Sequence, residues 1–183
     1  MLIGDIISKT AAEKAKKTAA VLDEEEITYE QLEKESNQLA NGLIDLGIKP
    51  SDMVSIMLPN SIEFLTAYLG VIKSGATMVP LNISFKTPAV EYILNNSEAK
   101  IIITSQKFLP LIKECNLDFV EKIILVDGDQ ADDYLLMKEF KDQPADLPEL
   151  KNIDEGFTAA CLYTSGTTGQ PKGAMLTHHN LIF

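Results

Sequence analysis

Four short apolar runs, separated by stretches with helical periodicity, set the strongest limit on how this chain folds. The runs cover residues 53–58, 77–81, 100–104 and 121–126. Short, continuously apolar strands are typically buried on both faces, and strands that alternate with helices form βαβ units. The sequence therefore predicts an α/β fold with a parallel-rich sheet and helices on both of its faces.

Local signals indicate where the helices between these runs begin and end. Thr28 and Gln31 have the spacing of a capping box, and Gly47 is expected to end the helix that follows. The other expected elements are helices over 4–17, from a cap at Asn60 or Ser61 to about Ser74, from a Thr87 cap to about Asn95 and over 107–114, and a hairpin of 18–22 with 26–29.

The last part of the chain contains a loop rich in glycine and hydroxyl side chains, residues 163–173 with the sequence YTSGTTGQPKG. Residues 156–163 predict a buried strand before it, and Thr177 is expected to cap a helix after it. Main-chain N–H groups, hydroxyls and one lysine at such a turn are suited to phosphate. Lys172 is the only formally charged side chain in residues 156–183, although the whole chain has a net charge of −11. A glycine-rich turn without a ligand is the alternative interpretation.

The loop differs from the P-loop pattern G-x-x-x-x-G-K-[ST], because Lys172 lies between Pro171 and Gly173. It resembles the signature loop [ST]-[ST]-G-T-T-G-x-P-K-G of the adenylate-forming enzymes, which include acyl-CoA synthetases, luciferase-like enzymes and peptide-synthetase adenylation domains. Other stretches resemble the fatty-acyl and aryl-CoA ligase branch of that family: 28–32, 58–64, 67–70, 73–76, 79–82 and 177–180.

The resemblance implies that residues 1–183 are the N-terminal portion of an AMP-binding domain, part of the larger N-terminal domain of such an enzyme. Within it we expect a βαβ-type unit at 1–126, an acidic connection at 127–155, and a strand, phosphate loop and helix start at 156–183. Family members are several-fold longer, so the chain is expected to be an N-terminal piece. The family's aromatic-rich acyl pocket, acidic magnesium ligand, ribose-binding Asp and C-terminal domain with its catalytic Lys would then lie elsewhere, which leaves no catalytic residue within this piece.

By the same resemblance, the expected activity is that of an ATP-dependent acyl-CoA synthetase, specifically a fatty-acid–CoA ligase. Such an enzyme activates a carboxylic acid as acyl-AMP and transfers the acyl group to coenzyme A, and this piece alone is expected to be inactive. The expected cofactors are ATP, Mg²⁺ and coenzyme A, and Thr164 is the expected contact to Mg²⁺. The residues expected to bind the ATP phosphates are Thr164, Ser165, Gly166, Thr167, Thr168, Gly169 and Lys172. His178 is expected to be structural.

Composition excludes several other classes of protein. The negative net charge argues against a nucleic-acid partner, and no apolar run reaches the roughly 18 residues of a membrane helix. Cys115 and Cys161 fit neither a metal site nor a disulfide framework, which favours a cytoplasmic location. Residues 127–155 hold ten acidic and three basic side chains but lack the spacing of a calcium loop, so they predict a solvated connection with a short helix near 133–140.

A function of a different class remains possible at this point. A non-catalytic α/β module could self-associate through apolar surfaces that a longer enzyme would bury, and such a module would form homo-oligomers.

Overall fold

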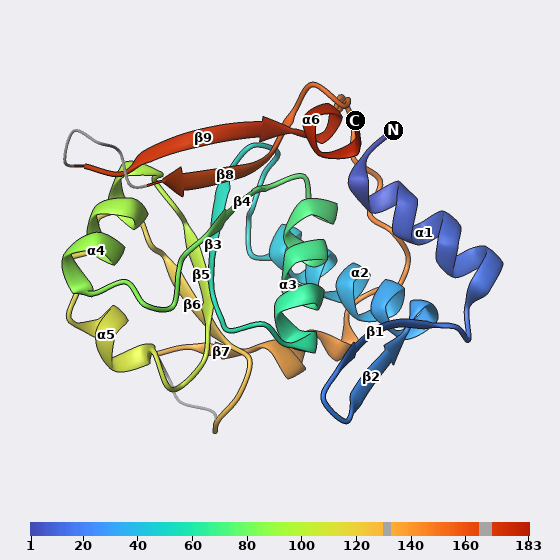
Figure 1. Cartoon of the computed structure of the whole chain (residues 1–183), viewed down its shortest axis with the longest axis horizontal. Coiled ribbons are helices and arrows are strands. Elements are labelled where there is room, and N and C mark those ends of the chain that lie inside the picture. The colour runs from blue at the N-terminus through green and yellow to red at the C-terminus, as the bar shows by residue number, and fades with distance from the viewer. Residues whose placement is uncertain (130–132, 165–169) are drawn as a thin grey trace.

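The computed structural model describes residues 1–129, 133–164 and 170–183. Within these residues, seven strands form one sheet in the order β7-β6-β5-β3-β4-β8-β9 (Figure 1). Adjacent strands are parallel except that β9 runs antiparallel to β8. The strands are β3 (Met53–Met57), β4 (Thr77–Pro80), β5 (Ile101–Thr104), β6 (Lys122–Leu125), β7 (Leu135–Leu136), β8 (Thr158–Thr164) and β9 (Lys172–Thr177). The α/β fold predicted from the four apolar runs is confirmed.

Helices cover both faces of this sheet, as Figure 1 shows. One face is covered by α3 (Ile62–Lys73), with α2 (Tyr29–Asp45) and α1 (Ile3–Lys14) outside it. The other face is covered by α4 (Thr87–Asn96) and α5 (Leu109–Lys113). Because the crossovers from β3 to β4 and from β4 to β5 use opposite faces, the sheet is wound in both directions from β3. In sheets of this kind ligands bind at the carboxyl ends of the strands.

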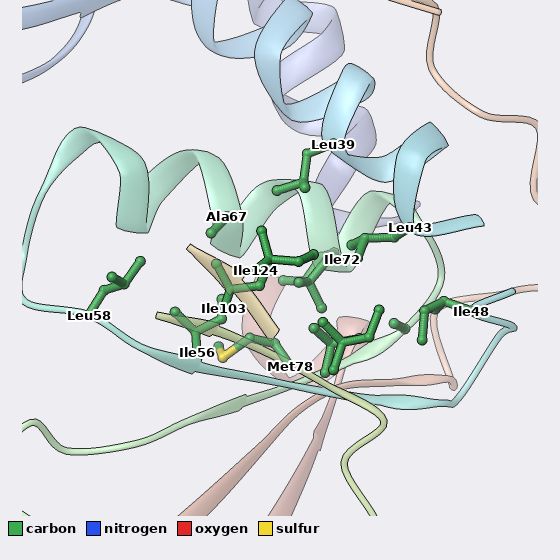
Figure 2. Packing of buried hydrophobic residues seen from close by; sticks show 14 of the residues in the cluster. Leu39, Leu43, Ile48, Ile56, Leu58, Ala67, Ile72, Met78, Ile103 and Ile124 are labelled. Carbon is green, nitrogen blue, oxygen red and sulfur yellow. The ribbon is translucent and has the colours of Figure 1, made fainter. Parts of the chain in front are cut away.

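The core is built by the alternation of side chains along each buried strand. Ile56, Ile103 and Ile124 point to the α3 side, where Leu39 and other side chains of α2 and α3 enclose them (Figure 2). Their neighbours in sequence point to the α4 side, where the buried cluster includes Met57, Val79, Ile102, Val90 and Ile93. Burial on both faces explains why the strands read as continuous apolar runs.

Several predicted helix signals are confirmed at atomic detail. The Thr28 hydroxyl accepts the Gln31 N–H at 3.3 Å, and the Gln31 side chain accepts the Thr28 N–H at 3.0 Å, so the capping box is present. The Ser61 hydroxyl accepts the Phe64 N–H at 3.0 Å and caps α3. Gly47 has φ +94°, the left-handed conformation expected after a helix end.

A buried lysine, which the sequence analysis did not single out, joins α3 to α2. The Lys73 ammonium donates to Glu33 Oε2 at 2.6 Å, to the Ser36 hydroxyl at 2.8 Å and to Asn37 Oδ1 at 2.8 Å. The Lys73 side chain is 0% exposed. Burial lowers the pKa of Lys73, and the nearby Glu33 carboxylate partly opposes that shift. The hydrogen bonds from Lys73, Ser8 and Asn37 outweigh burial at Glu33 and lower the pKa of its carboxyl group.

The structure differs from the prediction in three places. Residues 172–177 form strand β9, whereas a helix was expected to follow the loop with no strand between them. The short helix expected near 133–140 is strand β7 followed by the 3-10 helix η1 (Met137–Asp142). Thr87 is the first residue of α4 and Lys86 is its cap, because the Thr87 hydroxyl donates to Glu114 at 3.0 Å instead of capping the helix.

The acidic segment is also more closely packed than a solvated connection would be. Side-chain amides of α2 donate to its main-chain carbonyls: Asn37 to Ala145 at 2.8 Å and Asn41 to Pro144 at 2.8 Å. Phe140 is 8% exposed and packs against Gly42. The predicted N-terminal hairpin, by contrast, is confirmed as β1 (Thr18–Leu22) with β2 (Glu25–Thr28). Among the described residues, every helix is too short or too polar to cross a bilayer.

Candidate phosphate-binding site

The β8–β9 hairpin brings together the two described residues that were expected to bind phosphate. In its register Thr164, the last residue of β8, is paired with Lys172, the first residue of β9. Both side chains are exposed. The hydroxyl and the ammonium therefore flank the chain segment that joins the two strands. Of the other predicted site residues, Ser165, Gly166, Thr167, Thr168 and Gly169 lie outside the described residues.

An open cleft of about 650 Å³ lies beside this hairpin, at the carboxyl ends of the parallel strands. Its lining comes from the residues that follow β3, the residues that follow β4, and β8 itself. The described lining residues are Leu58, Pro59, Asn60, Phe64, Pro80, Leu81, Asn82, Ile83, Phe85, Leu162 and Tyr163. None of these is an acid, a lysine, an arginine or a histidine. A cleft of this chemistry suits an uncharged organic group placed next to a phosphate.

Tyr163 lies at the boundary between the cleft and the hairpin. Its hydroxyl donates to Asn96 Oδ1 at 2.7 Å. Burial, with the nearby Cys161 and Tyr92 side chains, raises the pKa of Tyr163 to about 12. The phenol is therefore protonated at neutral pH and remains a hydrogen-bond donor. Sequence analysis missed Tyr163 as a separate contributor, although its place directly before the loop was a usable signal.

The hairpin leads into α6 (His178–Ile182), which contacts the start of the chain. The Thr177 hydroxyl accepts the Asn180 N–H at 3.1 Å, so Thr177 caps this helix as predicted. His178 is 2% exposed, and its Nδ1 accepts the Ile3 N–H at 3.2 Å. Burial lowers the pKa of His178, which keeps the ring neutral and able to accept. This contact agrees with the structural role expected for His178.

The residues around the hairpin offer few metal ligands. Within residues 1–129, 133–164 and 170–183, no three His, Cys, Asp or Glu side chains group closely enough to hold a metal ion. Cys115 and Cys161 are both free thiols, and burial raises the pKa of each. Magnesium in phosphate sites keeps several waters and takes other oxygens from the substrate. The Thr164 hydroxyl fits such a shell as a single protein oxygen.

Comparison with known proteins identifies the family of the chain and agrees with its fold. Residues 7–183 match the family model of the AMP-binding enzymes. Crotonobetaine/carnitine–CoA ligase of Citrobacter koseri is 36% identical in an alignment of 179 positions that covers 91% of this chain and 34% of that protein. Bacitracin synthase 1 of Bacillus licheniformis is 33% identical in an alignment of 184 positions that covers 98% of this chain and 3% of that protein. The crystal structure of the anthranilate CoA ligase AuaEII in complex with anthranoyl-AMP is 33% identical with a TM-score of 0.91, and the match covers 97% of this chain and 35% of that one.

The mostly parallel sheet flanked by helices matches the N-terminal domain of adenylate-forming enzymes. The chain belongs to the family of AMP-binding enzymes. It spans about a third of the length of the CoA ligases it matches and a far smaller share of the peptide synthases.

Proposed function

We propose that the β8–β9 hairpin binds the triphosphate of ATP in an enzyme that activates a carboxylic acid as acyl-AMP. The pairing of Thr164 with Lys172 across the ends of the loop is the observation that carries this proposal. Thr164, Ser165, Gly166, Thr167, Thr168 and Gly169 would donate N–H and hydroxyl groups to the β- and γ-phosphates, and Lys172 would neutralise their charge.

Electrostatics support this assignment. The chain as a whole is acidic, yet Lys172 is the only formally charged residue in 156–183. The described lining of the adjoining cleft contains no carboxylate. A polyphosphate at the hairpin would therefore meet one cation and little repulsion from nearby groups.

The finer features of the reaction are part of the same proposal. The acyl acceptor is coenzyme A and the acid is a fatty acid. The Thr164 hydroxyl would be the protein contact to Mg²⁺, which would neutralise charge on the phosphates. The cleft supports an acid that carries an apolar group, because its described lining is dominated by Leu, Ile, Phe and Pro side chains. A cytoplasmic location is supported by the two free cysteines. A panel of alkyl and aryl acids tests the acid, and a clear preference for aryl acids would replace the fatty-acid assignment.

Titration calorimetry with ATP and with inorganic tripolyphosphate tests the phosphate site directly. Lys172→Ala should weaken binding of both ligands by about tenfold or more, since one charge-assisted contact contributes roughly 1.5–3 kcal/mol. Lys151→Ala removes an exposed lysine from a distant loop and is the matched control. Equal affinities for the wild-type protein and Lys172→Ala would contradict the site.

Adenylation itself is proposed to need more of an enzyme than residues 1–183. The chain spans 35% of the anthranilate CoA ligase chain that it superposes on. We therefore expect this chain to show no acid-dependent exchange of pyrophosphate into ATP. Exchange above background with any acid in the panel would overturn that expectation while leaving the phosphate site in place.

A second candidate function is self-association as a non-catalytic module, and one observation favours it. Strand β9 forms an edge of the sheet, and the Met175 side chain on it is 57% exposed. Exposed apolar edge strands invite pairing with another chain. Multi-angle light scattering distinguishes the two functions: a concentration-dependent dimer that Met175→Lys abolishes would favour the module, and a monomer at all concentrations would exclude it.

A further inference from the structure

The two faces of the β8–β9 hairpin carry different side chains. Side chains alternate along each strand, so Thr164 and Lys172, which are paired, share one face. The next pair along the hairpin, Tyr163 and Gly173, belongs to the opposite face, and Cys161 lies on that face as well. The face that carries the proposed phosphate contacts is therefore backed by an aromatic ring, a thiol and a glycine.

The ring of Tyr163 lies directly over Gly173. A Cβ atom placed on Gly173 would lie 2.7 Å from the Cys161 Sγ and 3.2 Å from the Cε2 and Cζ atoms of Tyr163. A glycine within a strand weakens the strand because it has no side chain to pack, and an aromatic ring across it restores that packing. Gly173, the residue next to Lys172, is thus in close contact with the Tyr163 ring.

The same tyrosine is attached to a rigid part of the fold. Its hydroxyl donates to Asn96 Oδ1 at 2.7 Å, and Asn96 is the last residue of α4. Helix α4 is fixed to the sheet by buried side chains that include Val90 and Ile93. Strand β9 forms an edge of the sheet, and four of its six residues are exposed. Tyr163 therefore connects the exposed edge strand β9 to helix α4, which packs against the sheet.

From these contacts we propose that Tyr163 is a positioning residue for Lys172. Its ring presses on Gly173 from one face, and its hydrogen bond to Asn96 fixes the ring, so that Lys172 is held opposite Thr164 on the other face. This inference rests on the proposed phosphate role of Lys172, but the anchoring of the strand can be measured without any ligand.

Amide hydrogen exchange in β9 tests the anchoring. Tyr163→Phe keeps the ring and loses the hydrogen bond, and should speed exchange of the β9 amides about threefold, because an exposed hydrogen bond contributes little. Tyr163→Ala loses both contacts and should speed exchange by about tenfold or more. Tyr29→Phe on α2 removes a tyrosine hydroxyl from another part of the fold, is the matched control and should leave β9 unchanged. Exchange at the wild-type rate in Tyr163→Ala would overturn the proposal.

A rescue experiment tests the close approach at Gly173. Gly173→Ala places a methyl group against the Cys161 Sγ and should speed exchange of the β9 amides. Cys161→Ala removes that sulfur, so the double variant should exchange more slowly than Gly173→Ala alone. A double variant that exchanges as fast as Gly173→Ala, or faster, would show that the contact does not hold the strand.

Coupling to Lys172 separates positioning from general stability. With tripolyphosphate as the probe, Tyr163→Phe should weaken binding about threefold in the wild-type background. In a Lys172→Ala background the same change should have no further effect, because the group that it positions is gone. An equal loss in both backgrounds would overturn the positioning role. If the wild-type chain does not bind tripolyphosphate, the proposed function is wrong, and exchange in β9 still decides whether Tyr163 anchors the strand.

Discussion

The buried pair of Lys73 and Glu33 makes an asymmetric prediction about stability. Glu33 Oε2 accepts from Lys73, while Glu33 Oε1 accepts from the Ser8 hydroxyl at 2.7 Å and from the Asn37 amide at 2.9 Å. In Glu33→Gln one of these oxygens becomes an NH₂ group that faces a donor whichever way the amide is turned. The substitution also leaves the Lys73 ammonium, 0% exposed, without a counter-charge.

Glu33→Gln should lower the free energy of unfolding by about 3 kcal/mol. This is the lower end of the range for removing one partner of a buried ion pair, because the Glu33 side chain is partly open to water. Lys73→Met should cost less, roughly 1–2 kcal/mol. The Glu33 side chain is 17% exposed and keeps its Ser8 and Asn37 donors, so the carboxylate left behind is still solvated. Methionine also fills most of the volume of the lysine stem.

Urea unfolding followed by circular dichroism measures both changes. Glu35→Gln, on the exposed side of the same helix, is the control and should shift the free energy of unfolding by less than about 0.5 kcal/mol. A cost below about 1 kcal/mol for Glu33→Gln, or a larger cost for Lys73→Met than for Glu33→Gln, would refute this account of the network.

Four further substitutions test other parts of the fold. Burial lowers the pKa of His178 below its usual 6.5, Asp5 partly opposes this, and the N-terminal ammonium adds to it. The hydrogen bond from Ile3 therefore stabilises the protein above pH 6.5 and is lost as the pH falls through the lowered pKa. Thermal melts from about pH 5 to 8 give the melting temperature as a function of pH, and His178→Gln should flatten the acidic part of that curve. Gly47→Ala should lower the free energy of unfolding, measured in urea, by about 1 kcal/mol, because the φ of Gly47 is +94°. Gly75→Ala should lower it further, because the new Cβ would also lie 2.7 Å from Ile153 Cδ1. Thr177→Ala should cost about 1 kcal/mol through loss of the α6 cap, with faster amide exchange confined to that helix.

Sequence analysis predicted the elements whose signals are local. The capping box at Thr28, the cap at Ser61 and the left-handed glycine at Gly47 each act within one turn of helix, so their patterns were sufficient. The four parallel strands were found because burial on both faces leaves a continuous apolar run.

Strand β9 was missed for a physical reason. Its residues Lys172, Gly173 and Ala174 have low strand propensity, and most of the strand is exposed, so neither composition nor alternation marks it. It forms a strand because it pairs with β8, which is a tertiary effect. The segment at 133–140 was misassigned similarly, since the short strand β7 depends on pairing with β6.

The candidate site was predictable in part. The loop motif identified Thr164 and Lys172, and their pairing across the hairpin is consistent with that prediction without testing it. The contacts of Tyr163 with Asn96 and Gly173 were not predictable from the sequence. They join α4 to the hairpin, and Asn96 is far from Tyr163 in the sequence. The buried Lys73 was missed for the same reason, since its partners lie on another helix.

The central claim is that the β8–β9 hairpin binds a triphosphate. Nuclear magnetic resonance of the ¹⁵N-labelled chain, titrated with ATP and Mg²⁺, tests this claim most directly. The account predicts saturable shifts concentrated at the amides of residues 164–173, and their loss in Lys172→Ala. Shifts concentrated instead at the basic end of α1, around Lys14 and Lys17, or no saturable shifts at all, would contradict it.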